Sequence, residues 1–480
     1  MSSELCLLIV IIYFLLLIVI SYYTSRKATN QTFFTSNRNS PWYLVAFGMI
    51  GASLSGVTFI SIPGEVGNSA WKYLPLVLGN CIGYIFIAQV LLPLFYKKGL
   101  VSIYSWLEER FGENAKLIGS FFFIISQLIG ASFRLFLVVG VLQLAVFNQL
   151  GISFELTVII TILLVWLYTF KGGIKTIVWT DTLQTFFMLL SVIITVGVIA
   201  KSLQFDLASL INTVIDNPSS QILEFDWRDK HNFLKQFISG LAMTIAINGL
   251  DQNMMQKNLT CKNLEESKKN MFTFTFLFLI CNIIFLTLGS MLYIYAEQTD
   301  FTLPQKSDEV FASIALGKLG AISAICFILG VVAAAYSSVD SSLTSLTTSF
   351  SIDFLKLNTI KEENKNKRVL IHFIFSVLMC LVIIIFKYVN NSSVVSAVFT
   401  AVGYTYGPIL GLFAFGLTTK YSLKVKYIPY ICITSPILSF FINLYSKELL
   451  NGYQFGFEIL ILNALLCFLG LLLIRTKTHH

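Results

Sequence analysis

Long apolar stretches recur along the whole chain, and they restrict its fold more than any other feature. About thirteen can be delimited, at 4–23, 42–62, 72–95, 117–147, 153–170, 176–200, 235–255, 271–296, 319–349, 369–388, 393–416, 427–446 and 454–474. An α-helix needs about 20 apolar residues to cross the hydrocarbon core of a bilayer, whereas strands of a membrane barrel are shorter and alternate in polarity. The pattern therefore predicts an all-α integral membrane protein.

Charged side chains are scarce, at 12% of the 480 residues, and the mean hydropathy is +0.78. Soluble domains carry roughly 25% charged residues, which cover their surface. A soluble enzyme, a nucleic-acid-binding protein and a disordered scaffold are therefore excluded. The first apolar stretch lacks both a preceding basic segment and a following small-residue cleavage motif. We expect it to remain as a span of a single membrane domain.

The distribution of Lys and Arg between the loops predicts the orientation of the chain. If the N-terminus lies outside, the loops on the cytoplasmic side carry 23 of the 33 basic residues, and the outer loops carry nine. Arg134 is the remaining one, and it lies in an apolar stretch. Because cytoplasmic loops are enriched in Lys and Arg, we expect the N-terminus outside and the C-terminus inside the cell membrane.

Polar and glycine residues interrupt the stretch at 42–62, where Gly51, Ser53, Ser55, Gly56 and Thr58 follow one another closely. A break in a membrane helix frees backbone carbonyls that can bind a cation, and such breaks mark ion and substrate sites in secondary transporters. The alternative is a face of small residues that packs against another helix.

A second interruption lies in the stretch at 235–255, where the sequence reads Asn-Gly-Leu-Asp at 248–251. An ordinary polar helix end is the alternative here. The two interrupted stretches are five spans apart, so each would open a half of five helices, as in transporters built from inverted repeats. The expected organisation is a leading helix and loop (1–41), a first repeat (42–200), an extracellular loop (201–234), a second repeat (235–416) and two C-terminal helices with a short tail (417–480).

Two carboxylates within apolar stretches, Asp181 and Asp340, are candidate cation ligands. Asp340 shares one helix face with Ser337, Ser341 and Thr344, because these residues recur every three or four positions. Carboxylate and hydroxyl oxygens suit a hard cation, and a polar seam between helices is the alternative. Asp181 either belongs to such a site or reaches water from the membrane interface.

Arg134 lies deep in the long stretch at 117–147. A cation at this depth is a functional candidate by default. Its planar guanidinium would pair either with a carboxylate of the protein or with an anionic substrate.

Four segments together resemble the sodium:solute symporter family, and the resemblance covers nearly the whole chain. They are GASLSGVTFISIPG at 51–64, KGGIKTIVWTDTLQ at 171–184, GLDQNMMQKNLT at 249–260 and YSSVDSSLTSLTT at 336–348. The resemblance implies a leucine-transporter-like fold, in which two inverted five-helix repeats each begin with a broken helix. It also implies sodium as the coupling ion and no other cofactor.

The resemblance also implies positions for the ions. The main sodium site of the family uses carbonyls of the broken helix and groups of the eighth core helix. Carried over to this chain, these are Gly51, Leu54, Ala334, Ser337 and Ser338. A second cation site, found in members that resemble sialic-acid transporters, would use Asp181, Ser337, Asp340 and Ser341. Those members have a serine where this chain has Asp340.

Solute residues carried over from the family are Ser53, Ser55, Thr58 and Arg134. The arginine is the one that sialic-acid transporters use for the substrate carboxylate. The polar residue that hexose carriers place in the following helix is missing near Val77. We therefore expect sodium-coupled symport of an anionic sugar such as sialic acid. The alternative is a neutral sugar, a polyol or another organic anion.

Two other functional classes were weighed. A solute sensor would carry a soluble output domain, for which the tail after Leu473 is too short. A membrane enzyme would need a catalytic cluster, which the four histidines do not form. We expect a transporter that is not an enzyme, that binds solute and sodium but no nucleic acid, and that functions as a monomer in the plasma or bacterial inner membrane.

Overall fold

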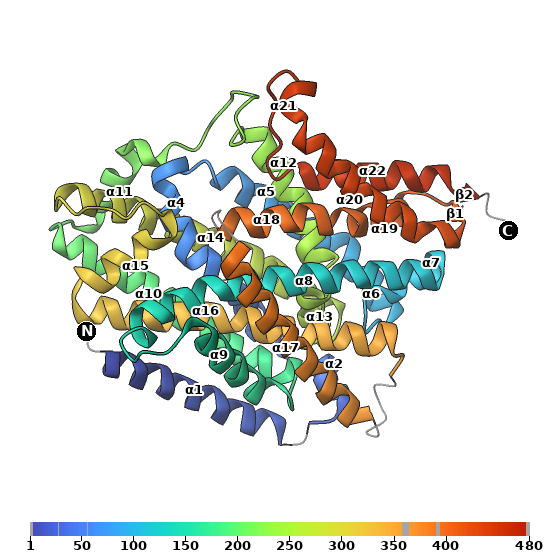
Figure 1. The fold of residues 1–480 in the computed structure, drawn as a ribbon, viewed down its shortest axis with the longest axis horizontal. Helices are drawn as coiled ribbons and strands as arrows, with labels where there is room; N and C mark the ends of the chain where they lie inside the picture. Colours follow the sequence, from blue (N-terminus) through green and yellow to red (C-terminus); the bar gives the residue numbers. More distant parts are fainter. Residues whose placement is uncertain (1–2, 27, 55, 358–363, 390–393, 477–480) are drawn as a thin grey trace.

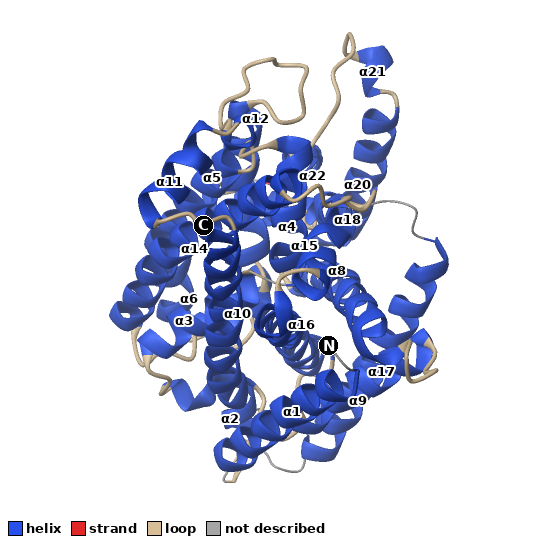
Figure 2. Cartoon of the chain, turned by 90° about the vertical axis from the view of Figure 1, so that its left-hand side faces the viewer, coloured by secondary structure: helices blue, strands red, loops and turns tan. Residues whose placement is uncertain are grey.

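The computed structural model of the chain describes residues 3–26, 28–54, 56–357, 364–389 and 394–476. Helices form nearly all of this part of the chain (Figures 1 and 2). Its strands are β1 (Ser422–Leu423) and β2 (Arg475–Thr476), which pair antiparallel. They fasten the end of the last helix to the loop that follows α19 (Gly407–Thr418). The fold is therefore all-α, as the hydropathy pattern predicts.

The helices of the first half precede the long loop that ends at Asn232. They are α1 (Ser3–Ser25), α2 (Asn30–Thr35), η1 (Ser36–Arg38), α3 (Trp42–Ser53), α4 (Gly56–Ser69), α5 (Leu74–Phe86), η2 (Ile87–Leu91), α6 (Leu92–Lys98), α7 (Ser105–Phe111), α8 (Glu113–Leu142), η3 (Gln143–Phe147), α9 (Phe154–Thr169), α10 (Ile174–Ser202), α11 (Leu207–Asp216) and η4 (Pro218–Ser220).

The helices of the second half end beside the C-terminus. They are α12 (Phe233–Thr244), η5 (Ile245–Gly249), α13 (Gln252–Asn258), α14 (Leu264–Gln298), α15 (Ser307–Gly317), α16 (Gly320–Ser349), η6 (Phe350–Phe354), α17 (Lys365–Val389), α18 (Val394–Thr405), α19, η8 (Val425–Tyr427), α20 (Ile428–Leu444), α21 (Ser446–Leu449) and α22 (Ile459–Leu473).

Each of the thirteen apolar stretches overlaps one helix or a run of two or three consecutive helices. Within the described residues, eight helices are long and apolar enough to cross a membrane, and ten spans result if each bent pair counts as one. The stretches at 153–170, 393–416 and 454–474 form shorter apolar helices. A total of thirteen spans therefore stays a prediction.

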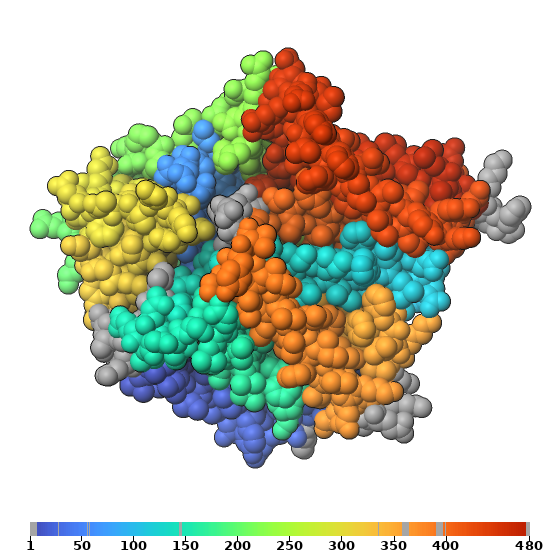
Figure 3. All heavy atoms as spheres, in the orientation of Figure 1, coloured from blue at the N-terminus to red at the C-terminus, as the bar shows by residue number. Residues whose placement is uncertain are grey.

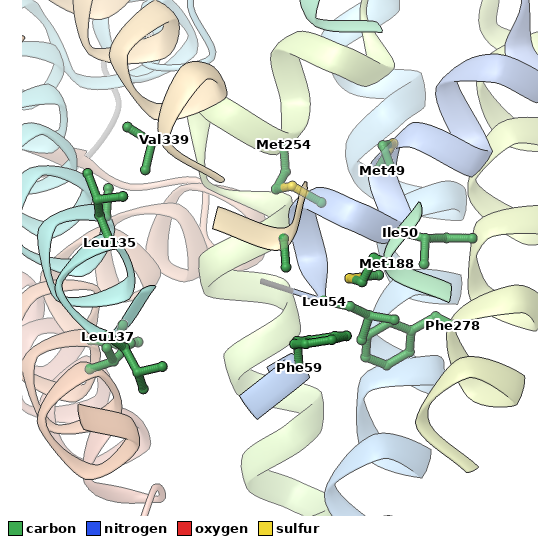
Figure 4. Packing of buried hydrophobic residues seen from close by; sticks show 14 of the residues in the cluster. Met49, Ile50, Leu54, Phe59, Leu135, Leu137, Met188, Met254, Phe278 and Val339 are labelled. Atoms are coloured by element: carbon green, nitrogen blue, oxygen red, sulfur yellow. The ribbon is translucent and has the colours of Figure 1, made fainter. Parts of the chain in front are cut away.

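Two pairs of consecutive helices are sharply bent where the sequence predicts breaks. The axes of α3 and α4 differ by 52°, and those of α12 with η5 and α13 differ by 70°. Leu54 and Phe59, on either side of the first break, belong to one apolar cluster with Met188 and Phe278 (Figure 4). Each bend leaves backbone groups outside the helical hydrogen-bond pattern, and these groups need other polar partners.

The centre of the molecule is formed by α10 and α16, which pack along each other and against α3 (Figure 2). The polar face of α16 is turned inward, and all its hydroxyls from Ser337 to Ser349 are buried. Most of these hydroxyls donate a hydrogen bond to the backbone carbonyl four residues earlier, as those of Ser341 and Thr348 do. The polar face of α16 is thus enclosed by neighbouring helices.

The outer helices present apolar side chains to the surroundings. Leu15 on α1, Ile385 on α17 and Leu438 on α20 are more than half exposed. α17 crosses the face of the molecule that Figure 3 shows, between α9 and the C-terminal helices. An apolar periphery around a polar centre is the arrangement that a bilayer requires.

Candidate cation and solute sites

The first break exposes the C-terminal end of α3 to the interior. Helical geometry ends at Ser53, and Leu54 has φ −86° and ψ 68°. A helix C-terminus carries a partial negative charge on its last carbonyls, which favours a nearby cation. The broken helix expected from the glycines and hydroxyls is confirmed, while Ser55, a predicted solute residue, lies outside the described residues.

Gly51 brings α3 close to both central helices. Its backbone N–H donates to Thr185 Oγ1 at 2.9 Å. A methyl group added at Gly51 would lie 2.4 Å from Thr185 Oγ1 and 3.3 Å from Ser337 Oγ. The small residues therefore do provide a packing face, and this close packing brings the end of α3 to Ser337.

The α16 residues of the predicted main sodium site face this region. Ala334, Ser337 and Ser338 are all buried, and Ser337 Oγ has no hydrogen-bond partner. Ser338 Oγ donates only a long bond of 3.4 Å, to the Ala334 carbonyl. Buried hydroxyls are normally well bonded, so these two oxygens are available to a ligand. Ser338 and Leu54 also line one cavity, the central cavity described below.

Asp181 of the predicted second cation site forms a buried ion pair. Lys257 Nζ lies 2.6 Å from Asp181 Oδ2, and each residue is 1% exposed. Asp181 Oδ1 has no hydrogen-bond partner. Asp181 therefore does not reach water at the interface. Lys257 is one of the 23 basic residues assigned to cytoplasmic loops in the sequence analysis. It lies buried within α13 instead, so that assignment was wrong.

Asp340 is surrounded by hydroxyl and amide donors. Its Oδ2 accepts a bond from Tyr168 Oη at 3.0 Å and a longer one from Thr180 at 3.5 Å. Its Oδ1 accepts bonds from the Ser341 backbone N–H at 2.5 Å and from Ser341 Oγ at 3.2 Å. These donors come from three different helices, so the carboxylate links α9, α10 and α16.

The formal charges of this cluster do not balance when all three groups are ionised. Asp181 and Asp340 contribute two negative charges, and Lys257 contributes one positive charge. A buried net charge is expensive in a low-dielectric interior unless it is compensated. One additional monovalent cation would balance the cluster. Asp181 Oδ1 on α10 and Ser337 Oγ on α16 are unpartnered oxygens on the two helices that carry the carboxylates.

A central cavity of about 130 Å³ lies beside the first break. Ser53, Thr58 and Arg134, three of the four predicted solute residues, line it. Its other polar lining residues come mainly from α5, α8 and the second break. They are Tyr73, Asn80, Tyr84, Ser126, Gln127, Thr244, Asn248, Asp251, Asn253, Ser338 and Tyr406.

Arg134 has no ionic partner in this cavity. No acidic side chain of the described residues lies within 4.0 Å of its guanidinium, and its Nε is buried without a hydrogen-bond partner. Asp251 lines the same cavity, but it bonds to Tyr406 and to the first turn of α13. Of the two interpretations of Arg134, pairing with an external anion therefore fits the geometry better.

Several residues of these sites escaped the sequence analysis. Asp251 lies in the segment that was recognised as a break and Lys257 follows that segment, but neither was assigned a role. Gln127 donates from the cavity to Ser342 on α16 at 2.8 Å, and no pattern in the sequence marks it. Asp251 and Lys257 had a usable signal, since both lie within the matching segment at 249–260.

Comparisons with known proteins agree with this geometry. The profile of the sodium:solute symporter family matches residues 33–422. The sodium/sialic acid symporter NanT of Aliivibrio fischeri is 26% identical over 82% of this chain and 79% of its own length. The sodium/sialic acid symporter SiaT of Proteus mirabilis is 25% identical over 83% of this chain and 81% of its own length.

Solved structures show the same fold. A Na⁺-coupled sialic acid symporter in a substrate-bound, outward-open state superposes with a TM-score of 0.83, at 20% identity, over 98% of this chain and 99% of that one. Mhp1, a nucleobase-cation-symport-1 family transporter, gives a TM-score of 0.56 at 13% identity, over 92% of each chain. The expected leucine-transporter-like architecture is thereby confirmed.

Proposed function

Because the chain belongs to the sodium:solute symporter family, we propose that it imports a carboxylate-bearing sugar, such as sialic acid, together with sodium. The two curated relatives described above are sodium/sialic acid symporters, which supports this choice of solute. The observation that carries the proposal is Arg134, an arginine without an ionic partner in the central cavity. A carboxylate is the ligand that its planar fork fits.

Coupling follows from residues that the solute cavity shares with the proposed sodium site. Leu54 and Ser338 line the cavity, and both are among the proposed ligands of the main sodium ion, with Gly51, Ala334 and Ser337. An ion held there would fix the end of α3 against α16 and shape the solute site. Coupling of this kind is reciprocal, so solute must strengthen sodium binding by the same factor.

The charged cluster around Asp181, Asp340 and Lys257 supports a second cation. With Ser337 and Ser341, the two carboxylates would hold one more sodium ion, while Lys257 balances the other negative charge. Two sodium ions and one anion would then carry one net charge per cycle. A membrane potential of 100 mV contributes about 2.3 kcal/mol per charge, which is about a 50-fold accumulation of solute.

The transport cycle would use alternating access between two sides of the membrane. We place the N-terminus outside and assign the two five-helix repeats to 42–200 and 235–416, each opened by one of the two bent helix pairs. Sodium and solute enter from the outer side, and departure of the ions inward loosens the solute site. A single chain contains both breaks and the whole cavity, which supports action as a monomer.

Uptake into proteoliposomes tests the proposal. An inward sodium gradient should drive accumulation of N-acetylneuraminate by the wild type, and replacement by potassium should abolish it. Arg134→Ala should weaken N-acetylneuraminate binding about ten- to hundredfold, because charge-assisted hydrogen bonds are lost. Arg134→Lys should recover part of the affinity, because it restores the charge without the fork.

The exposed Arg26 provides a matched control, and Arg26→Ala should transport like the wild type. Unchanged uptake of N-acetylneuraminate by Arg134→Ala would contradict the assignment of the solute site. Sodium-driven uptake of a neutral hexose in preference to N-acetylneuraminate would favour the alternative solute class.

A further inference from the structure

An open groove of about 540 Å³ lies on the periphery of the bundle, between the end of α9 and the start of α17. These two helices pack against each other on the face that Figure 3 shows. Trp166 and Phe170 form the wall on the α9 side, and Lys365, Leu370 and Phe373 belong to the α17 side. No residue of the described part lines both this groove and the central cavity, so the groove is separate from the solute site.

The apolar part of the groove is open to the surroundings. Leu370 is 58% exposed and Phe373 is 50% exposed. The rings of Trp166 and Phe170 stack with their centroids 4.8 Å apart, and Phe373 meets Trp166 edge-on at 6.1 Å. Three aromatic rings and a leucine therefore form a surface on which an acyl chain can pack.

The polar end of the groove carries positive charge. Lys365 lines it, and Lys171 Nζ lies 5.4 Å from the centroid of the Phe170 ring. Both lysines are exposed, and no carboxylate of the described residues lies within 4.0 Å of either ammonium. The sequence at 361–368 contains four basic and two acidic residues. Two ammonium groups from different segments therefore attract an anion to this end.

Trp166 adds a hydrogen-bond donor to the groove. Its Nε1 is buried and lacks a hydrogen-bond partner among the residues that the structure describes. Buried donors normally have a partner, and the polar edge of a tryptophan at a membrane surface usually faces the head-group level. An acceptor oxygen of a bound lipid would satisfy this N–H group.

The groove joins two helices that also contact the polar face of α16. Thr169 at the end of α9 bonds to His372 Nε2 on α17 at 2.9 Å, and His372 Nδ1 bonds to Thr347 on α16 at 2.9 Å. Thr169 and His372 directly precede Phe170 and Phe373 of the groove. A ligand that holds these two aromatic residues together would therefore stabilise the contact among the three helices.

We infer that the groove binds one anionic phospholipid of the cytoplasmic leaflet. Its phosphate would lie between Lys365 and Lys171, and an acyl chain would follow Phe373 and Leu370. The cytoplasmic leaflet holds the anionic lipids, and basic pockets between membrane helices on that side recognise their head groups. The inference uses the orientation proposed above but neither the solute nor the ions, so it goes beyond the proposed function.

Native mass spectrometry of the delipidated full-length protein tests the inference, with dioleoylphosphatidylglycerol as the probe and dioleoylphosphatidylcholine as the reference. The wild type should bind one phosphatidylglycerol more tightly than phosphatidylcholine, because the two ammonium groups select the net negative charge. Lys365→Gln should weaken this binding about fivefold and the double variant with Lys171→Gln about thirtyfold, the effects expected for one and two basic residues beside an anionic lipid. Phosphatidylglycerol should also raise the unfolding temperature of the wild type but not that of the double variant.

The double variant of Lys97→Gln and Lys262→Gln is the matched control. Both lysines are exposed, lie outside the groove and form no ion pair within the described ranges, so this variant should bind phosphatidylglycerol like the wild type. Trp166→Phe keeps the aromatic wall and should weaken binding about two- to tenfold, the effect of one lost hydrogen bond.

Equal affinity of the wild type for the two lipids would overturn the inference, and so would unchanged phosphatidylglycerol binding by the double variant of Lys365 and Lys171. Neither result concerns the proposed function, which depends on sodium-driven uptake of the solute.

Discussion

The two helix breaks use different means to stabilise their free ends. At the first break, the groups of the described residues that adjoin the last turn of α3 are hydroxyls: Thr185 accepts from the Gly51 backbone N–H, Tyr84 bonds to Ser53, and Ser337 lies next to Gly51. At the second break, Asp251 accepts bonds from the backbone N–H groups of Asn253 at 2.7 Å and Met254 at 3.2 Å. Tyr406 donates to the other carboxylate oxygen.

The difference shows which break depends on a ligand. The second break contains its own N-cap and is completed by protein groups alone. At the first break, the C-terminus of α3 carries a partial negative charge and lies beside the unbonded Ser337 hydroxyl. A bound cation would therefore stabilise this helix end. We expect the first break to change with sodium and the second to keep its shape. Substitutions at Lys257, Ser338 and Asp251 test this contrast, and one at Glu224 compares a partly exposed ion pair with the buried one.

The largest effect should come from breaking the Lys257–Asp181 ion pair, which holds α13, the helix after the second break, against α10. Lys257→Met leaves Asp181 buried without its cation and should lower the free energy of unfolding by about 3–5 kcal/mol. The double variant with Asp181→Asn should recover most of this loss, because no unpaired charge remains. Thermal unfolding in detergent measures both, with the exposed Lys97→Met as the control. A single variant as stable as the wild type would show that the pair does not anchor α13.

Ser338→Ala should have the next largest effect, at the first break. It removes one proposed sodium ligand without creating a cavity, and sodium-dependent uptake should be lost at physiological sodium concentration. We expect sodium affinity to fall about tenfold or more, the effect of about 1.4 kcal/mol. Ser345→Ala, a buried position on α16 outside the proposed sites, should keep wild-type affinity. Equal sodium affinity in Ser338→Ala and the wild type would refute the ligand assignment.

Two substitutions of Asp251 separate the effect of its N-cap hydrogen bonds from the effect of its charge. Asp251→Ala removes the N-cap of α13 and should destabilise the protein by about 1 kcal/mol. Asp251→Asn keeps an oxygen acceptor and should lose less. Chemical unfolding at constant sodium compares the two variants. If adding sodium restored the stability of Asp251→Ala more than that of the wild type, the second break would also depend on the ion.

The smallest effect should come from an ion pair in the loops, between Lys72 after α4 and Glu224 before α12. The hydrogen bond from Lys72 lowers the pKa of Glu224. A lowered carboxylate pKa contributes stability above its value in the unfolded chain, and this stability is lost as the pH falls through the folded value. Acidification should therefore speed proteolysis of residues 217–232 in the wild type. Glu224→Gln should be cleaved at that faster rate already at pH 7, and its rate should change less with pH.

The two ion pairs also show why position matters more than distance. Lys72–Glu224 and Lys257–Asp181 have similar lengths, 2.8 Å and 2.6 Å. The first is partly exposed and screened by water, so it contributes little. The second is enclosed, so losing either partner leaves a charge that no solvent can stabilise.

The sequence alone determined the membrane class, the helical fold, both breaks and the inward polar face of α16. These are local properties, because hydropathy, glycine placement and the spacing of polar residues along one helix need no knowledge of its neighbours. The matching segments added the family and most of the residues proposed for ions and solute.

Only the tertiary structure decided which of these residues meet. Asp181 and Lys257 are 76 residues apart in the chain. No pattern in the sequence around either residue predicts that Lys257 Nζ lies 2.6 Å from Asp181 Oδ2. Arg134 could have formed a salt bridge with a carboxylate of the protein, and only the packing of α8 against its neighbours shows that no acidic side chain of the described residues lies within 4.0 Å of it. Distances between side chains on different helices follow from the packing of the whole bundle, which no single segment encodes.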